Sequence, residues 1–427
     1  MWSTPPLTEH QVRSAAAQGL AALAVDGLRL LVLIPDGTRT MPMPLMFEIL
    51  EQQLGPRVRA LDFLVALGTH PPMTDAELSR HLGRQVSNGR TGSSNVFNHR
   101  WDDPAAFVNV GTIPANEIAQ LTCGLMQQDV PVTLNRLILD YDHILICGPV
   151  FPHEVAGFSG GAKYFFPGIA GPEIIHFTHW LGALVTSYEI IGTADTVVRA
   201  VIHRAAACID RPHSLLVPVV THDGVAGIFC GPTIETWKQA AELSSRCHVV
   251  TVEEPFTRVL AMMPTMYSDL WTGAKGMYKL EPAMADSGEI VIFAPHITEV
   301  SRVHGHLIDE VGYHCRDYFL GQWDRFGHYP GAILAHSTHL RGQGVWDAVR
   351  KVEALRIKVT LATGISEEHC KRINLGYLDP ASVNPGEWHV IPNAGETVYR
   401  YCGSQAPGIS GMKYQRDVAG VSDFTVR

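Results

Sequence analysis

Short apolar runs that end in polar, glycine-containing loops recur along the first half of the chain. Three of these segments read "GLRLLVLIPDGTR", "LDFLVALGTHPPMTDAEL" and "DHILICGPVFPHEVAGFSGG", and "VVTVEEPF" at 249–256 is a fourth. Continuous apolar runs of this length are typical of strands buried in a parallel sheet. Thr74 or Asp75 is a suitable cap for a helix after the second loop. Helical stretches separate the runs, so the pattern predicts a doubly wound α/β sheet.

The second half of the chain shows the same pattern. "GEIVIFAPHI", "GAILAHSTHL" and "RIKVTLATGI" each read as a strand, followed by a polar or glycine-bearing loop. We therefore expect two α/β domains, a Rossmann-like N-terminal domain over residues 1–262 and a second domain over residues 263–395. A hinge is expected near Pro264, and residues 396–427 are expected to return to the first domain. The active site should lie in the cleft between the two domains.

Composition narrows the choice of partners. The chain has 427 residues, 46% of them apolar, which is enough for a large core and more than one domain. Its formal charge is -9 and its basic residues form no runs, which argues against a nucleic-acid partner. Eight scattered cysteines without a CxxC pair suggest neither a zinc ribbon nor a disulfide framework. No apolar run is long enough to span a bilayer and no secretory pattern is visible, so we expect a cytoplasmic protein with no membrane partner.

Candidate chemistry gathers in four short segments. They are "PDGTR", "GTHPPMT", "PHEVAGFSGGAK" and "HFTHW", and they hold Asp36, Arg39, His70, His153, Lys163, His176 and His179. Each segment lies at the end of a predicted strand or on the helix that follows. Because ligands of doubly wound sheets bind at the carboxyl ends of strands, these segments are expected to meet in one crevice.

The first three segments suggest anion binding and proton transfer. Asp36 and Arg39 share a turn and can hold a ribose hydroxyl and a phosphate or carboxylate, although a surface ion pair has the same pattern. A single histidine at a strand end is more often structural than catalytic. Two of them, His70 and His153, facing one crevice favour acid–base chemistry instead.

The segment "SGGAK" resembles a phosphate cradle. Ser159, Gly160 and Gly161 let backbone N–H groups approach an anion, whereas the alternative is a glycine turn beside an exposed Lys163. Tyr164 follows the lysine, so the segment is not a Walker A motif.

The remaining histidines leave alternatives open. His176 and His179 can share one helix face and bind a metal, but no further metal ligands are readable nearby. A second set either is structural or lines the interdomain cleft; it comprises His296, His304, His306, His336 and His339.

Taken together, the segments resemble the lactate racemase family of nickel-pincer nucleotide enzymes. That family shows an Asp-x-x-Arg turn, a Gly-Thr-His loop followed by Met-Thr, and Pro-His followed by Gly-Phe-Ser-Gly-Gly-x-Lys. A later histidine and a second-domain lysine complete its pattern, and here they are His179 and Lys275 of "LWTGAKGM". The steps of ten residues from His153 to Lys163 and sixteen from Lys163 to His179 agree with the family pattern.

The resemblance implies a cofactor. Lys163 would carry a nickel-pincer nucleotide covalently as a thioamide, and His179 would be the protein ligand of nickel beside the cofactor's own sulfur, carbon and sulfur donors. The nucleotide would be held by the turn and the glycine loop, that is by Asp36, Gly37, Thr38, Arg39, Ser159, Gly160 and Gly161. Cofactor-maturation proteins are then expected partners.

The resemblance also implies a reaction. The protein would racemise or epimerise C2 of a 2-hydroxy acid by reversible hydride transfer to the cofactor, with His70 and His153 as the two bases. Arg39 and Lys275 would hold the substrate carboxylate and orient its hydroxyl, and closure of the second domain would exclude water.

Departures from the family pattern bear on the substrate. Trp271 and Thr272 stand where lactate-type members have Tyr-Gln, and Pro71 replaces a common arginine. The shorter Thr272 leaves room and adds a hydroxyl, which favours a sugar acid such as an aldonate; a short aliphatic 2-hydroxy acid remains open. Two other functions also remain open, a zinc or other divalent-metal hydrolase or lyase and a non-enzymatic nucleotide- or sugar-acid-binding protein.

Overall fold

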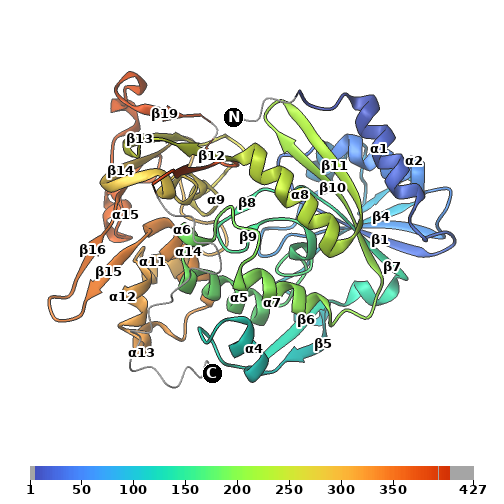
Figure 1. The fold of residues 1–427 in the computed structure, drawn as a ribbon, viewed down its shortest axis with the longest axis horizontal. Helices are drawn as coiled ribbons and strands as arrows, with labels where there is room; N and C mark the ends of the chain where they lie inside the picture. Colours follow the sequence, from blue (N-terminus) through green and yellow to red (C-terminus); the bar gives the residue numbers. More distant parts are fainter. Residues whose placement is uncertain (1–4, 393, 404–427) are drawn as a thin grey trace.

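A computed structural model of the chain describes residues 5–392 and 394–403, and two parallel sheets organise it (Figure 1). The larger sheet has seven strands in the order β11-β10-β7-β1-β2-β4-β3. Their bounds are β1 Arg29–Ile34, β2 Ala60–Val65, β3 Arg90–Thr91, β4 Ser94–Asn98, β7 His143–Cys147, β10 His213–Thr221 and β11 Gly224–Pro232. The central strands β10, β7, β1, β2 and β4 are parallel, and β11 and β3 are antiparallel edges.

Helices cover both faces of this sheet. In β1, Leu30 and Val32 pack with the first three helices, whereas Leu31 and Leu33 face the opposite way, into the core formed with later helices. The first group is α1 Glu9–Ala21, α2 Met43–Leu54 and α3 Asp75–Leu82; the later group includes α5 Pro172–Val185, α7 Val197–Ala206 and α8 Thr233–His248. Alternate strand residues point to opposite faces, so an all-apolar strand such as β1 requires both faces to be covered.

The predicted start of α3 is confirmed. Thr74 is its N-cap, and its hydroxyl accepts from the backbone N–H of Glu77 while the Glu77 carboxylate accepts from Thr74 N–H. This reciprocal pairing satisfies donors that a helix start leaves free. It also fixes where the loop after β2 ends.

The second sheet has five parallel strands in the order β18-β17-β14-β13-β19. They are β13 Phe256–Met262, β14 Met284–Ala294, β17 Lys358–Thr363, β18 Gly376–Tyr377 and β19 His389–Ile391. The segment 256–262 thus belongs to this sheet, although it precedes the expected domain boundary at 262/263. The segment "VVTV" forms β12 Val249–Val252, which pairs with β20 Val398–Tyr401. Of the segment expected to return to the first domain, 404–427 lies outside the described residues.

One predicted strand is wrong. "GAILAHSTHL" is not a strand but the helix α14 Gly331–Arg341, which packs against α5. Its residues from Ala332 to Leu340 are all buried, so no polar face reveals the helical period. A short apolar run of this kind fits a buried strand and a buried helix equally well. Pro330, its N-cap residue, was the local sign of a helix start.

Shorter elements complete the described chain. The hairpin and bridge strands are β5 Phe107–Ile113, β6 Val130–Asn135, β8 Pro152–His153, β9 Gly157–Phe158, β15 Gly344–Asp347 and β16 Val352–Leu355. The short helices are α4 Ala115–Leu121, α6 Ser187–Ile190, α9 Leu270–Gly273, α10 Lys275–Tyr278, α11 Gly305–Val311, α12 Arg316–Leu320, α13 Trp323–Phe326 and α15 Glu367–Arg372. The 3-10 turns are η1 Pro104–Ala106, η2 Arg136–Asp140, η3 Gly161–Tyr164, η4 Glu281–Ala283, η5 Pro380–Ser382 and η6 Pro385–Glu387.

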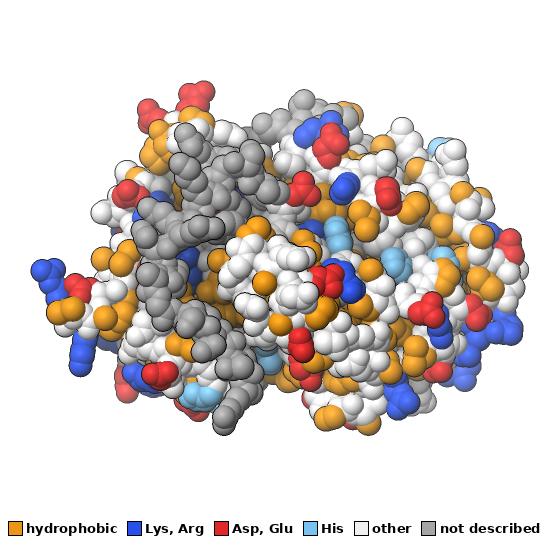
Figure 2. Space-filling model, turned by 60° about the horizontal axis from the view of Figure 1, so that its bottom comes forward, with side chains coloured by type: hydrophobic (Ala, Val, Ile, Leu, Met, Phe, Trp, Pro, Cys, Tyr) orange, Lys and Arg blue, Asp and Glu red, His pale blue; other side chains and the backbone are white. Residues whose placement is uncertain are grey.

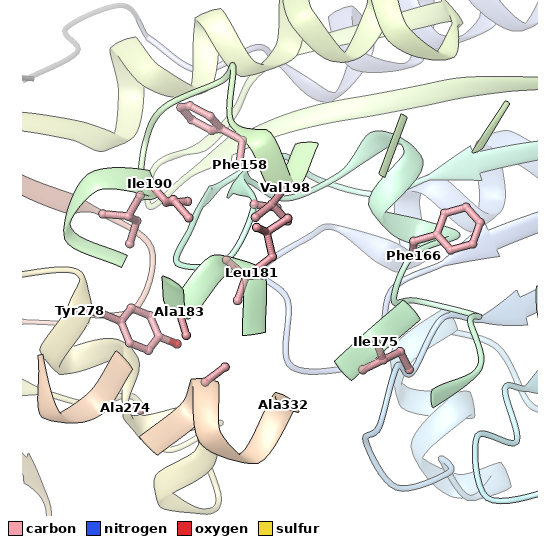
Figure 3. Packing of buried hydrophobic residues seen from close by; sticks show 14 of the residues in the cluster. Phe158, Phe166, Ile175, Leu181, Ala183, Ile190, Val198, Ala274, Tyr278 and Ala332 are labelled. Atoms are coloured by element: carbon pink, nitrogen blue, oxygen red, sulfur yellow. The ribbon is translucent and has the colours of Figure 1, made fainter. Parts of the chain in front are cut away.

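One hydrophobic cluster joins the two halves of the chain. It contains buried residues of both sheets, and Figure 3 shows part of it, with Ala274 and Tyr278 near Ala183 and Ala332. The prediction of an α/β fold with parallel strands is therefore confirmed.

Acidic and basic side chains are interspersed on the face drawn in Figure 2, so no large area of that face carries charges of one sign. Within the described residues, no helix combines the length and the apolar character that crossing a bilayer would require.

Candidate functional site

The candidate site lies at the carboxyl ends of β1, β2 and β7, which are neighbours in the large sheet. β1 pairs with β2 on one side and with β7 on the other, and all three strands are parallel. Strands that follow β1 in sequence are thus added first on one side of it and then on the other, so the strand order reverses beside β1. Open α/β sheets bind ligands at such reversals. A cavity of about 140 Å³ opens there. Of the predicted residues it is lined by Asp36, Arg39, His70, His153, Ser159, Gly160, Lys163, His179 and Trp271.

Asp36 orients His70. Its Oδ1 accepts from the N–H and the hydroxyl of Thr38, at 3.1 and 2.6 Å, and its Oδ2 lies 2.5 Å from His70 Nδ1. Burial alone would raise the pKa of the Asp36 carboxyl, but His70, Arg39 and Thr38 together hold it far below its usual range. The ionised carboxylate accepts the Nδ1–H of His70, so Nε2 is the ring nitrogen that remains for other partners. The structure thus gives Asp36 a role in addition to the expected cofactor contact.

His153 has the opposite arrangement. Its Nδ1 accepts from Val155 N–H at 3.1 Å, so the neutral ring carries its proton on Nε2. Burial, with Lys163 and Arg39 nearby, lowers the pKa of His153 well below its usual value and keeps the ring neutral. Glu154 Oε2 lies 3.3 Å from the same Nδ1 and can accept a proton there when the ring changes tautomer.

The glycine loop packs closely on the strand that precedes it. Gly160 and Gly161 have φ of 74° and 60°, and a Cβ at Gly160 would lie 2.5 Å from a methyl of Val150. The Ser159 hydroxyl accepts from Phe151 N–H at 2.9 Å and donates to Pro149 O. These contacts fix the loop against the end of β7, with Ser159 and Gly160 facing the cavity.

Lys163 reaches the cavity without a partner for its amine among the described residues. Burial, followed by the charge of Arg39, lowers the pKa of the Lys163 amine to about 7. An amine with this pKa is largely neutral near pH 7 and can act as a nucleophile. The sequence alone left open whether Lys163 is a solvated charge; its side chain lies in the cavity wall.

The structure separates the two histidines of α5. His179 lines the cavity, and its Nδ1–H donates to Ile175 O at 2.7 Å, which leaves Nε2 free to bind a metal. Burial lowers the pKa of His179 to about 4, so the imidazole is neutral, as a metal ligand must be. His176 does not line the cavity. Across the described residues, no group of three or more His, Cys, Asp or Glu side chains is placed to hold a metal ion.

The C-terminal half contributes one wall. Trp271 and Ala332 line the cavity, and the ring of His336 stacks on Trp271 at 4.0 Å. Lys275 donates to Tyr267 OH at 3.2 Å, and its pKa is lowered by burial and then by Arg39. Thr272 uses its hydroxyl within its own helix start, where it donates to Asp269 Oδ1 at 2.9 Å.

The other predicted cofactor-binding residues do not line the cavity. Gly37 and Thr38 belong to the turn that carries Asp36, and Gly161 is the residue of the glycine loop that packs against Trp237. Of the second set of histidines, His304 is next to Trp271 at 4.8 Å, and His296 binds Tyr267 O at 3.1 Å.

Sequence reasoning missed three polar residues of the cavity, Thr69, Glu154 and Tyr164. Each is the neighbour in sequence of a residue that was selected, His70, His153 or Lys163. A strand-end histidine followed by a carboxylate was a signal that could have found Glu154. Burial is the first influence on the pKa of Glu154 and raises it, but His339, Lys163 and Lys275 lower it further, so the carboxyl stays ionised.

Comparison with known families gives a partial match. The family model described as the lactate racemase N-terminal domain matches residues 9–191. Among curated proteins, the lactate racemase of Lactiplantibacillus plantarum is 28% identical over 163 residues, which cover 38% of this chain and 34% of that protein. The lactate racemase of Thermoanaerobacterium thermosaccharolyticum is 23% identical over 282 residues, covering 64% of this chain and 62% of that protein. The matched regions thus span about a third and about three fifths of these relatives.

Solved structures match over nearly the whole chain. The crystal structure of a protein from Thermotoga maritima is 30% identical with a TM-score of 0.85, and covers 94% of this chain and 100% of that one. The lactate racemase apoprotein of Thermoanaerobacterium thermosaccharolyticum has a TM-score of 0.69 at 18% identity, covering 93% of this chain and 94% of that one. The second likeness concerns the fold alone.

Proposed function

The chain belongs to the lactate racemase family, and from this premise we propose that it is an isomerase that inverts C2 of a 2-hydroxy acid. The observation that carries the proposal is the meeting of His70, His153, Lys163 and His179 in one cavity. Two imidazoles whose Nδ1 atoms have opposite partners, a carboxylate at His70 and a backbone N–H at His153, suit a reaction that removes a proton from a hydroxyl and returns one.

The residues present fit a nickel-pincer nucleotide. Lys163 offers a partly neutral amine for covalent attachment, and His179 offers one free imidazole nitrogen. A single protein ligand is enough only for a cofactor that brings its own metal donors, which agrees with the lack of a three-residue ligand group in the described chain. When bound, this cofactor supplies nickel(II) in a soft donor set and an acceptor for the hydride removed from C2.

The chain's own residues would perform the proton transfers. His70, held by Asp36, would accept the hydroxyl proton at Nε2. His153 would return its Nε2–H to the product oxygen only as its Nδ1, beside Glu154, gains a proton from solvent, so that the ring is not left as an imidazolate. For the opposite enantiomer the two rings exchange roles, with Glu154 accepting at His153 Nδ1. Arg39 holds the substrate carboxylate.

We place the site in a cleft between two α/β units. Support comes from Trp271 and Ala332, which line the same cavity as residues of the large sheet. Closure of the second unit would exclude water from the intermediate.

A sugar acid such as an aldonate is the substrate we favour. The hydroxyl of Thr272 is bonded to Asp269, so other polar groups would contact the substrate. Tyr164 and Thr69 line the cavity and add polar groups beyond those that the reaction requires, and the carboxylate of Glu154 lies in the same wall. Carboxylate and hydroxyl groups suit the distal hydroxyls of a polyhydroxylated chain.

A substrate panel on cofactor-loaded protein tests the proposal. Aldonates, aldarates, lactate and malate are compared by isotope exchange at C2, with nickel content and the mass of the Lys163 peptide measured in parallel. We expect epimerisation of an aldonate, and loss of turnover but not of the mass increment in His70→Ala and His153→Ala. Glu154→Gln should raise KM for the aldonate more than for lactate.

Other results would support other functions. Stoichiometric zinc without a modified Lys163 would indicate a zinc hydrolase or lyase. A loaded protein without exchange on any 2-hydroxy acid would leave a nucleotide- or sugar-acid-binding protein.

A further inference from the structure

Three successive carbonyls of the glycine loop point away from the cavity. Phe158 O accepts from Arg199 Nη2, Ser159 O accepts from Trp237 Nε1 at 2.9 Å, and Gly160 O accepts from Arg199 Nη1 at 3.3 Å. The donors come from α7 and α8, which lie behind the loop. One arginine and one tryptophan therefore bind the whole turn from its far side.

The Arg199–Trp237 pair is itself an unusual feature of a protein interior. The guanidinium carbon lies 4.1 Å from the centre of the Trp237 ring, and the two residues are 2% and 1% exposed. No carboxylate of the described residues is within ion-pair distance of Arg199, and its Nε has no hydrogen-bond partner. A buried charge without a counter-ion is costly, so a structural role alone is a poor reason to keep one here.

The loop rests directly on this pair. A Cβ at Gly161 would lie 2.7 Å from Trp237 Cδ1, and Gly161 has a positive φ that side chains rarely adopt. Gly161 also begins η3, the turn that carries Lys163. The position of the Lys163 backbone therefore depends on where Arg199 and Trp237 hold the carbonyls.

We propose that Arg199 and Trp237 are positioning residues that turn the carbonyls of residues 158–160 away from the cavity, so that the loop presents the amides of Gly160 and Gly161 and the Lys163 amine to an anionic, acyl-bearing nucleotide. The nucleotide part of this inference rests on the proposed function. An anion on the cavity side of the loop would also offset the buried charge of Arg199. That charge is one of the influences that lower the pKa of Lys163, after burial and Arg39.

Acetylation of the apoprotein tests the positioning without any cofactor. The rate at which N-hydroxysuccinimidyl acetate modifies Lys163 at pH 7 is measured by mass spectrometry, relative to the exposed Lys371. Arg199→Met should slow the reaction about tenfold, because small displacements of a reacting group have large effects. Trp237→Phe keeps the ring but loses the donor to Ser159 O and should have a smaller effect. Arg199→Lys, which keeps the charge and one donor, should restore part of the rate.

Arg204→Met is the matched control. Arg204 lies on the same helix and pairs with Glu117 rather than with the loop, so its loss should leave the Lys163 rate unchanged. Wild-type rates in both Arg199→Met and Trp237→Phe, or an equal loss in Arg204→Met, would overturn the proposal. If Arg199→Met does not fold, Trp237→Phe and Arg199→Lys decide it.

Cofactor loading then separates this inference from the function on which it rests. In cells with the maturation pathway, the mass increment on the Lys163 peptide should fall in the Arg199 and Trp237 variants and persist in Arg204→Met. An unmodified wild-type Lys163 would contradict the proposed function, while the acetylation result would still stand. Equal cofactor loading of the wild type and of the Arg199 and Trp237 variants would contradict the positioning role instead.

Discussion

At the scale of single residues, the two cavity histidines differ in which nitrogen is free. His70 donates from Nδ1 to Asp36, whereas His153 accepts at Nδ1 from Val155. The two rings thus have different partners at Nδ1, a carboxylate at His70 and a backbone N–H at His153. The difference comes from contacts and not from the histidines themselves.

Asp36→Asn should disturb His70 first. An amide can donate to Nδ1, so the ring loses its preference for the tautomer with a free Nε2 lone pair. We expect kcat of the loaded enzyme to fall about 10²-fold to 10⁴-fold. Nitrogen NMR of the His70 ring should show the change of tautomer. Thr38→Val removes one hydrogen-bond donor to Asp36 but keeps the Asp36 carboxylate, and should leave the His70 ring spectrum unchanged. An unaltered His70 spectrum in Asp36→Asn would refute the role of Asp36 in orienting that ring.

The lowered pKa of the Lys163 amine predicts that the stability of the apoprotein depends on pH. Its pKa falls from 10.5 to about 7 on folding, chiefly through burial. Between these values the unfolded chain binds a proton that the folded chain lacks, so stability rises with pH. Lys163→Met should therefore stabilise the apoprotein most below pH 7, by about 1–3 kcal/mol, with the gain fading toward pH 10.5. Urea unfolding across this range measures it, and the exposed Lys371→Met should show no such trend.

At the scale of elements, the close packing of α14 on α5 brings the C-terminal half to the cavity. Gly331 begins α14, where a Cβ would lie 2.5 Å from His176 O and 3.0 Å from Trp180 Cβ. The next residue, Ala332, lines the cavity, and α5 carries His179. The missing side chain at Gly331 therefore sets the distance between two walls of the site.

Gly331→Ala should force the two helices apart. We expect a loss of about 1–3 kcal/mol in the free energy of unfolding, because the new methyl meets backbone that cannot yield cheaply. Gly305→Ala is the matched control, since Gly305 begins α11 and its Cβ would meet open space. That variant should be neutral or slightly stabilising. Equal stability of the two variants would contradict the packing argument.

At the scale of the whole molecule, a buried lysine ties distant segments together. Lys279 Nζ donates to Pro152 O at 2.7 Å and to Glu396 O at 3.0 Å, and Lys279 O accepts from Tyr399 N–H. One residue therefore connects β8, the end of α10 and the segment after β19.

Lys279→Met should leave the two carbonyls, Pro152 O and Glu396 O, without a donor. Each buried unpaired group costs about 1–3 kcal/mol, so urea unfolding should report a loss of about 2–4 kcal/mol. Lys358→Met at an exposed ion pair with Glu289 should change stability by less than about 0.5 kcal/mol. A loss no larger than that of the control would show that the bridge does not stabilise the fold.

The chain itself determined those features that arise from neighbours in sequence. The apolar runs of β1, β2 and β7 and the polar loops after them predicted the sheet edge, and Thr74 or Asp75 predicted a helix start. Such signals depend on local periodicity and capping, which act over a few residues. The family pattern then assigned roles to residues on those loops.

Tertiary structure decided what depends on partners far along the chain. α14 is buried by α5, α10, α11 and α12, and this burial on all sides removes the polar face that would mark its helical period in the sequence. The carboxylate of Asp36 meets His70, 34 residues away, and Arg199 reaches the loop from 39 to 41 residues away. A side chain's partners follow from how the strands and helices pack, because hydrogen bonds select among neighbours that only the folded chain brings together.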